Sequence, residues 1–98
     1  MAEKYVLDSH HLAIPCDNLI KWAEWFENAD RVVKCEEIEG VTVSTVFLGI
    51  NHRFGEGDPL LFETMIFGGE HDGTQMRCST WVEALVQHKD AVALVTDE

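Results

Sequence analysis

The most regular alternation of apolar and polar residues lies between positions 41 and 67. Segment 41–48 reads VTVSTVFL and segment 60–67 reads LLFETMIF, so both are rich in β-branched and aromatic residues. Such segments favour strands over helices. Three glycines and one proline lie between them and interrupt regular structure. The pattern therefore predicts two strands, 41–48 and 60–67, joined by an irregular loop.

Two short apolar pieces at positions 4–7 and 12–14 precede the first helical pattern and predict a small hairpin or an edge strand. After them, Leu19, Trp22, Ala23 and Phe26 recur at the spacing of one helix face. This pattern predicts an amphipathic helix that opens at 16–18 and ends near 28. Asp17 is its expected N-cap, because a carboxylate there can accept the unpaired backbone N–H groups of the first turn.

The segment 31–38, RVVKCEEI, alternates less regularly and carries charges at Lys34, Glu36 and Glu37. Because charged residues discourage foreign strands from pairing with a sheet edge, this segment predicts a strand near an edge. Glu39-Gly40 follows between two apolar runs and predicts a tight turn into the strand that begins at 41.

The last third of the chain is predicted to contain a polar loop, 70–79, and a second helix. Thr80 and Glu83 fit a capping box, in which the hydroxyl accepts a backbone N–H and the carboxylate reaches back. His88 falls on the apolar stripe of this helix, and we expect it at the boundary of the core with one ring nitrogen bonded. The stripe consists of Trp81, Leu85, Val92 and Val95.

Together these elements predict an α+β fold: an antiparallel sheet of three or more strands with two amphipathic helices packed mainly on one face. The chain has no strand–helix–strand unit with a glycine-rich turn, so a dinucleotide-binding fold is disfavoured. With 98 residues and no linker or internal repeat, the chain is expected to form a single domain, 1–98.

Charge narrows the classes of function. The sequence has 18 acidic and seven basic residues, a formal net charge of -11, which disfavours direct binding to nucleic acids and anionic membranes. No apolar run approaches the ~20 residues that a membrane span requires, and no signal-peptide pattern is present. The three cysteines form no C-x-x-C pair. We therefore expect a cytoplasmic protein whose acidic surface either only solvates it or meets a basic partner.

The two predicted loops, 50–59 and 70–79, offer a candidate anion site. Two arginines could hold a phosphate-bearing ligand, and an aromatic ring could stack on its base. The candidate ligand-binding residues are His52, Arg53, Phe54 and Arg77. In the alternative interpretation, Arg53 pairs with Glu56 or Asp58 and only stiffens its loop, and the capping box occupies the anion site of the second helix.

Acidic and aromatic residues are candidates for a protein interface. The candidate partner-binding residues are Glu36, Glu37, Glu56, Asp58 and Trp25. Trp25 lies off the centre of its helical stripe and Phe54 lies in a loop, so both are candidates for an interface. The number of large aromatics in so short a chain predicts a possible homodimer.

Catalytic chemistry has little support in the pattern. The histidines, cysteines and acids lack the spacing of a metal motif such as H-E-x-x-H, so no metal, cofactor or catalytic residue is predicted. A small metal- or histidine-dependent hydrolase would have to use His52 with Glu56, Asp58 or Glu63.

The string VSTVFLGINHRFGEGDPLLFETMIFGG, followed by STWVEALVQH, resembles a family of short uncharacterised proteins of tailed phages and prophages. The resemblance covers about two thirds of the chain, from position 31 onward, and implies a phage accessory protein in a bacterial host. Three hypotheses follow. The first is a stoichiometric inhibitor of a basic host protein, such as a CRISPR or other nucleic-acid-handling defence protein. The second is a protein that sequesters a nucleotide signal, and the third is the hydrolase.

Overall fold

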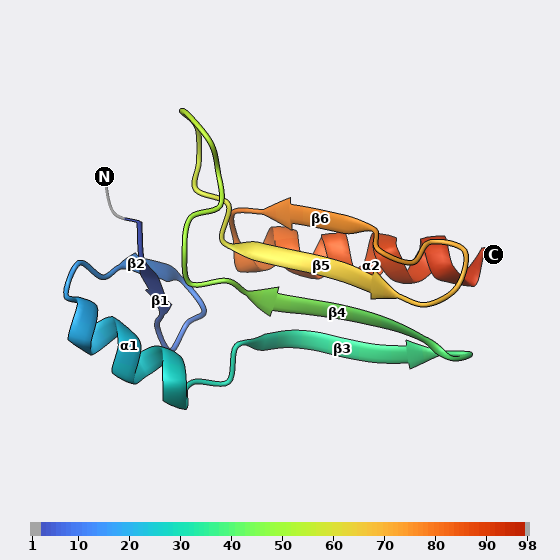
Figure 1. The fold of residues 1–98 in the computed structure, drawn as a ribbon, viewed down its shortest axis with the longest axis horizontal. Helices are drawn as coiled ribbons and strands as arrows, with labels where there is room; N and C mark the ends of the chain where they lie inside the picture. Colours follow the sequence, from blue (N-terminus) through green and yellow to red (C-terminus); the bar gives the residue numbers. More distant parts are fainter. Residues whose placement is uncertain (1–2, 98) are drawn as a thin grey trace.

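The computed structural model of the protein describes residues 3–97, and it confirms the predicted α+β class (Figure 1). The strands form two antiparallel sheets, one of order β1-β2 and one of order β3-β4-β5-β6. The elements in chain order are β1 (Tyr5–Leu7), β2 (Ala13–Pro15), α1 (Leu19–Asn28), β3 (Val32–Ile38), β4 (Val41–Phe47), β5 (Phe62–Phe67), β6 (Gln75–Cys78) and α2 (Trp81–Thr96).

The predicted central pair of strands is present as β4 and β5, and β3 lies beside β4 at one edge of the sheet, as its charges predicted. The turn between β3 and β4 is tight, because Ile38 pairs directly with Val41. Its two central residues, Glu39 and Gly40, have φ of 49° and 83°. Positive φ at both central positions is the twist that suits a two-residue hairpin turn.

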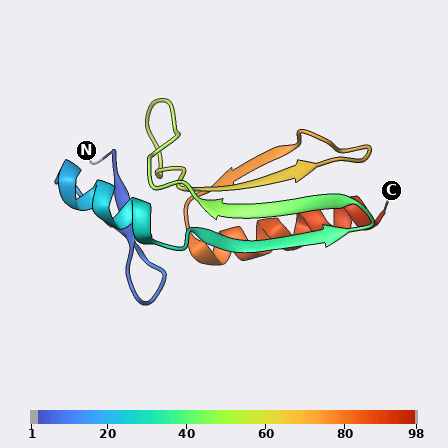
Figure 2. The same ribbon diagram turned by 60° about the horizontal axis from the view of Figure 1, so that its bottom comes forward.

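The four-stranded sheet carries α2 along one face, where the helix contacts all four strands (Figures 1 and 2). Alternate residues of the central strands point to this helix and are buried. They are Val41, Val43, Thr45 and Phe47 on β4, and Phe62, Thr64 and Ile66 on β5. The helix α1 lies with β1 and β2 at one end of the sheet and contacts β1.

The buried stripe of α2 differs from the predicted one. The residues buried on this helix are Ala84, His88, Ala91 and Val95. Leu85, predicted to be in the stripe, is 43% exposed. Small side chains at positions 84 and 91 let the helix approach the sheet closely, and this contact outweighs the larger hydrophobicity of leucine. The predicted capping box of Thr80 and Glu83 is present.

Two further predictions are corrected. The expected loop 70–79 contains β6, which pairs with β5 through Arg77 opposite Glu63 and Met76 opposite Thr64. The strand was missed because an edge strand of four residues, QMRC, shows only one aliphatic position. The N-cap of α1 is Asn18, whose side chain accepts the backbone N–H of Lys21, and not Asp17.

The helix α1 is attached mainly through aromatic side chains. The indole N–H of Trp22 donates to the carbonyl oxygens of Tyr5 and Gly49, at 3.1 and 3.2 Å. Gly49 has φ of +75°, and a Cβ there would lie 3.0 Å from the ring of Phe26. The glycine therefore provides both the backbone conformation and the space that this contact requires.

Candidate functional site

A polar layer crosses the core between the sheet and α2. Thr45 and Thr64 are each 0% exposed, and His88 is 2% exposed. The layer separates two apolar clusters, one around Val43 and Ile66 and one around Phe47. His88 was expected at the boundary with one bonded nitrogen, but it lies in the core and both ring nitrogens are bonded.

The hydrogen bonds of this layer form one chain. The Gln87 amide donates to the hydroxyl of Thr64, which lies 2.7 Å from the hydroxyl of Thr45. Thr45 lies 2.7 Å from Nδ1 of His88, and Nε2 of His88 lies 2.9 Å from the Glu36 carboxylate. A carboxylate only accepts, and a neutral imidazole has one donor nitrogen. With His88 neutral, each hydrogen bond of the chain is therefore donated in the direction from Gln87 toward Glu36.

A hydroxyl, an imidazole and a carboxylate in series are the groups of a nucleophile, its base and the orienting acid. Here the hydroxyl of Thr45 is completely buried, so no substrate can reach it. The chain of hydrogen bonds instead pairs the polar groups that are buried in the core. The hydrogen bond from His88 lowers the pKa of Glu36 below its ordinary value of 4.5, and Lys34 contributes a smaller lowering.

Of the predicted ligand residues in loop 50–59, Arg53 is held by its own loop. Nε of Arg53 donates to the carbonyl of Asp58, and its side chain lies over Gly57 at 3.1 Å from the position of a Cβ. Asn51, which the sequence reasoning did not single out, closes the base of the loop by accepting the N–H groups of Arg53 and Leu60. Phe54 is fully exposed, at 101%.

Arg77 lies on β6 and forms an ion pair with Glu63 of β5 at 2.9 Å. The two arginines therefore have different partners within the protein: Arg77 pairs with Glu63, and Arg53 bonds the carbonyl of Asp58. His52 is exposed, and its backbone N–H donates to Leu60. The nucleotide and hydrolase hypotheses, which need these side chains to converge on a ligand, stay predictions.

The predicted partner-binding residues lie in different places. Trp25 is half-buried and packs edge-on against Phe47, with ring centroids 5.7 Å apart. Glu36 belongs to the hydrogen-bond chain described above. Glu56 and Asp58 are exposed in loop 50–59, at the end of the sheet that faces α1. Glu37 is exposed near the opposite end of the sheet.

That opposite end gathers carboxylates from three segments. The β3–β4 turn, the β5–β6 turn and the C-terminal end of α2 meet there (Figures 1 and 2). The two turns touch, since a Cβ on Gly68 would lie 3.3 Å from the carbonyl oxygen of Gly40. We call this surface the acidic end, and its exposed acidic residues within positions 3–97 are Glu37, Glu39, Glu70, Asp72 and Asp97.

Positive charge is sparse at the acidic end. Segments 37–42, 66–74 and 91–97 contain no lysine or arginine. The C-terminal end of α2 adds the negative pole of its helix dipole, and its last turn has no basic residue. Elsewhere, five cations lie against groups of their own chain: Lys4 and Arg31 over aromatic rings, Lys34 and Arg77 in ion pairs, and Arg53 in its loop.

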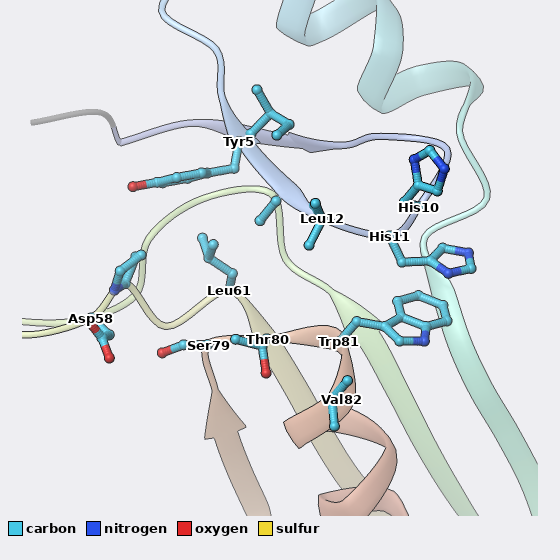
Figure 3. Close-up of a pocket in the computed structure, with 13 residues that line it drawn as sticks. Tyr5, His10, His11, Leu12, Asp58, Leu61, Ser79, Thr80, Trp81 and Val82 are labelled. Atoms are coloured by element: carbon cyan, nitrogen blue, oxygen red, sulfur yellow. The ribbon is translucent and has the colours of Figure 1, made fainter.

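The other end of the sheet has a pocket of about 560 Å³ between the β1–β2 hairpin, loop 50–60 and the start of α2 (Figure 3). The pocket is predominantly apolar. The labelled side chains around it include Tyr5, Leu12, Leu61, Trp81 and Val82. Sequence reasoning missed it because its walls come from three segments that are distant in the chain.

The tip of the β1–β2 hairpin is ordered against this pocket. The Asp8 carboxylate accepts the backbone N–H groups of His10 and Leu12, and the bond from Leu12 is the main reason why the pKa of Asp8 is lowered from 3.8. His11 has φ of 63° and stacks on Trp81, with centroids 3.8 Å apart and planes 7° from parallel. A non-glycine residue with positive φ requires such compensating contacts.

The cysteines are free thiols in different surroundings. Burial is the main reason why the pKa of the Cys78 thiol is raised to about 11, and Glu83 adds to the shift. Cys35 is exposed on β3, and Cys16 precedes α1. Within residues 3–97, no three histidine, cysteine or acidic side chains converge in a way that could hold a metal ion.

Comparisons with protein families, with curated proteins and with solved structures find no match for this chain. Neither of the two helices of the described chain is long and apolar enough to cross a membrane.

Proposed function

We propose that this protein binds and blocks a basic surface of another protein, and that the acidic end makes the contact. The observation that carries the proposal is the gathering of Glu37, Glu39, Glu70, Asp72 and Asp97 in segments without lysine or arginine. A merely solvating surface would mix the two signs of charge. Local concentration of one sign instead attracts a surface of the opposite sign and accelerates association with it.

The partner class follows from charge and context. Basic grooves are common in proteins that handle nucleic acids, because such proteins neutralise phosphates with lysine and arginine. Together with the resemblance to phage proteins, this supports a stoichiometric inhibitor of a nucleic-acid-handling defence protein in a bacterial host. The carboxylates of the acidic end would then occupy positions that phosphates of the nucleic acid normally take.

The test is capture from bacterial lysate at low and moderate salt, with matched charge variants. One variant neutralises Glu37, Glu39, Glu70 and Asp97 by Glu→Gln and Asp→Asn. Asp72 is left intact because its carboxylate accepts the backbone N–H of Gly68. The control neutralises four exposed acids outside the acidic end: Asp17, Glu24, Glu27 and Asp90.

We expect the wild type and the control to capture a salt-sensitive partner that double-stranded DNA or RNA displaces. The acidic-end variant should lose at least about tenfold in affinity, since several close charge pairs are removed together. Equal loss in both variants would show that only the net charge matters. The absence of a salt-sensitive partner across several hosts would overturn the proposal.

A further inference from the structure

The pocket at the hairpin end is independent of the acidic end, because it lies at the other end of the sheet and has different chemistry. Its volume of about 560 Å³ is within the ~300–1,000 Å³ typical of sites for small organic molecules. Its floor is fixed by buried Leu61, and one wall by the stacked rings of His11 and Trp81. A site with such ordered walls needs little rearrangement to receive a ligand.

The rim of the pocket leaves apolar side chains in water. Leu12 is 61% exposed, Ile14 is 41% exposed and Val82 is 69% exposed, although all three line the same opening. Covering this rim with an apolar ligand removes that surface from water, which is favourable in proportion to the area covered. The ring of Tyr5 and the stacked pair of His11 and Trp81 favour a flat ring over a bulky aliphatic body.

The charges around the pocket indicate which kind of flat apolar ligand it would bind. No lysine or arginine lines the pocket. The titratable side chains that line it are Tyr5, His10, His11 and Asp58, and Asp58 is the only carboxylate among them. The Asp58 carboxylate lies at the mouth beside Ser79, whose hydroxyl can accept or donate a hydrogen bond, and beside Thr80, whose hydroxyl is held in the capping box with Glu83 (Figure 3). The net charge of -11 repels anions from the whole molecule.

We propose that this pocket binds a small organic cation made of a flat apolar ring and a protonated amine, the arylalkylamine class. The ring lies over Leu61 beside the stacked rings of His11 and Trp81, and the ammonium group meets Asp58 at the mouth. Aromatic faces near the ammonium add attraction, since a cation over a ring interacts with its quadrupole.

The test uses three probes with the same ring and different charge: tryptamine, indole and indole-3-propionate. Binding is followed by chemical-shift changes in two-dimensional NMR spectra of the full chain. We expect tryptamine to shift resonances of Leu12, Leu61 and Trp81, and to bind about tenfold more tightly than indole-3-propionate. Asp58→Asn should weaken tryptamine about threefold and leave indole unchanged, because one exposed ion pair contributes modestly.

Each variant has a matched control. Glu56→Gln removes the same charge from the same loop outside the pocket and should leave tryptamine binding unchanged. Leu12→Ser should weaken all three probes equally, whereas Leu19→Ser, at an equally exposed position (61%) on α1, should weaken none. Shifts that fall outside the pocket, equal affinity for the cation and the anion, or no binding of tryptamine would each overturn the proposal.

Discussion

The N-terminal unit, residues 3–30, and the sheet–helix body, residues 31–97, are built on different principles. Every fully buried residue lies between positions 41 and 95, and none lies between 3 and 40. The body closes its core between α2 and the sheet, with a polar layer between the two apolar clusters. The N-terminal unit is attached by half-buried side chains that pack on the Phe47 cluster, by the Trp22 indole, and by backbone hydrogen bonds that join Tyr5 to Gly49 and Asn51 to Glu3. We therefore expect the N-terminal unit to open more readily than the body.

The two proposed binding surfaces differ in how they relate to these two regions. The acidic end belongs entirely to the body and is formed by two turns that contact each other. The pocket lies where the N-terminal unit meets the body, so it is complete only while the hairpin is docked on the body. Ligand binding there should stabilise the attachment of the hairpin, since a ligand stabilises the state that it binds.

The largest effect is expected from Phe62→Ala. Phe62 is 0% exposed and contacts Phe47 and Trp81. Truncating a buried phenylalanine costs about 3–5 kcal/mol, so the free energy of unfolding measured in urea should fall by that amount. Phe54→Ala, at the fully exposed loop position, is the control and should leave it unchanged. Equal losses in both variants would contradict the assignment of the core.

A smaller loss is expected from His88→Ala, which leaves the buried Thr45 hydroxyl bonded to Thr64 but without an acceptor for its own proton. One unpaired buried polar group costs about 1–3 kcal/mol, so a loss of that size is expected in the same urea assay. His52→Ala should have no effect, because His52 is exposed. Replacing the layer completely, by Thr45→Val, Thr64→Val and His88→Leu, should recover most of the loss. If the triple variant is less stable than His88→Ala, the chain of hydrogen bonds stabilises the fold by itself.

Trp22→Phe should act on the N-terminal unit alone. It removes the N–H that bonds Tyr5 and Gly49 while keeping an aromatic ring. Backbone hydrogen exchange in α1 should accelerate about tenfold, and exchange in β4 should stay at the wild-type rate. Ile20→Ala, at a position 71% exposed on the same helix, should change neither rate. Acceleration in both segments would show that the two regions unfold together.

The smallest effect is a pH dependence carried by Glu36. Its pKa is lowered in the folded protein, mainly by the hydrogen bond from His88, so the stabilisation is fully present above pH 4.5 and is lost as the pH falls further. Urea unfolding between pH 6 and 3 should therefore show a shallower decline for Glu36→Gln than for the wild type. Glu37→Gln, one residue away on the opposite face, should keep the wild-type slope.

The elements that could be predicted are those with an unambiguous local signal. The alternation in β4 and β5, the Glu39-Gly40 turn and the Thr80–Glu83 capping box each depend on nearby residues, and all three are present. β6 was missed because its pairing depends on β5, with an ion pair between Arg77 and Glu63 that no local pattern shows.

The buried face of α2, the acidic end and the pocket could not be predicted from local sequence patterns for a related reason. Leucine is more hydrophobic than alanine, so the sequence pattern predicted that Leu85 would be buried. Ala84 is buried instead, because only a small side chain fits where the helix approaches the sheet closely. The role of His88 depends on Thr45 and Glu36, which are 43 and 52 positions away. The candidate pocket and the acidic end likewise combine distant segments, so only the contacts of the folded chain bring them together.

Glu36 also favours the observed alignment of β3 on β4, in addition to the two-residue turn between them. Sliding β3 by two residues would preserve which face each side chain occupies, but it would put Lys34 or Ile38 in place of Glu36 opposite Val43. Neither can accept the proton of His88. Sliding by one residue would supply Glu37 but would turn Ile38 out of the core. The carboxylate of Glu36 thus adds a second constraint to the register that the two-residue turn already sets for this edge strand.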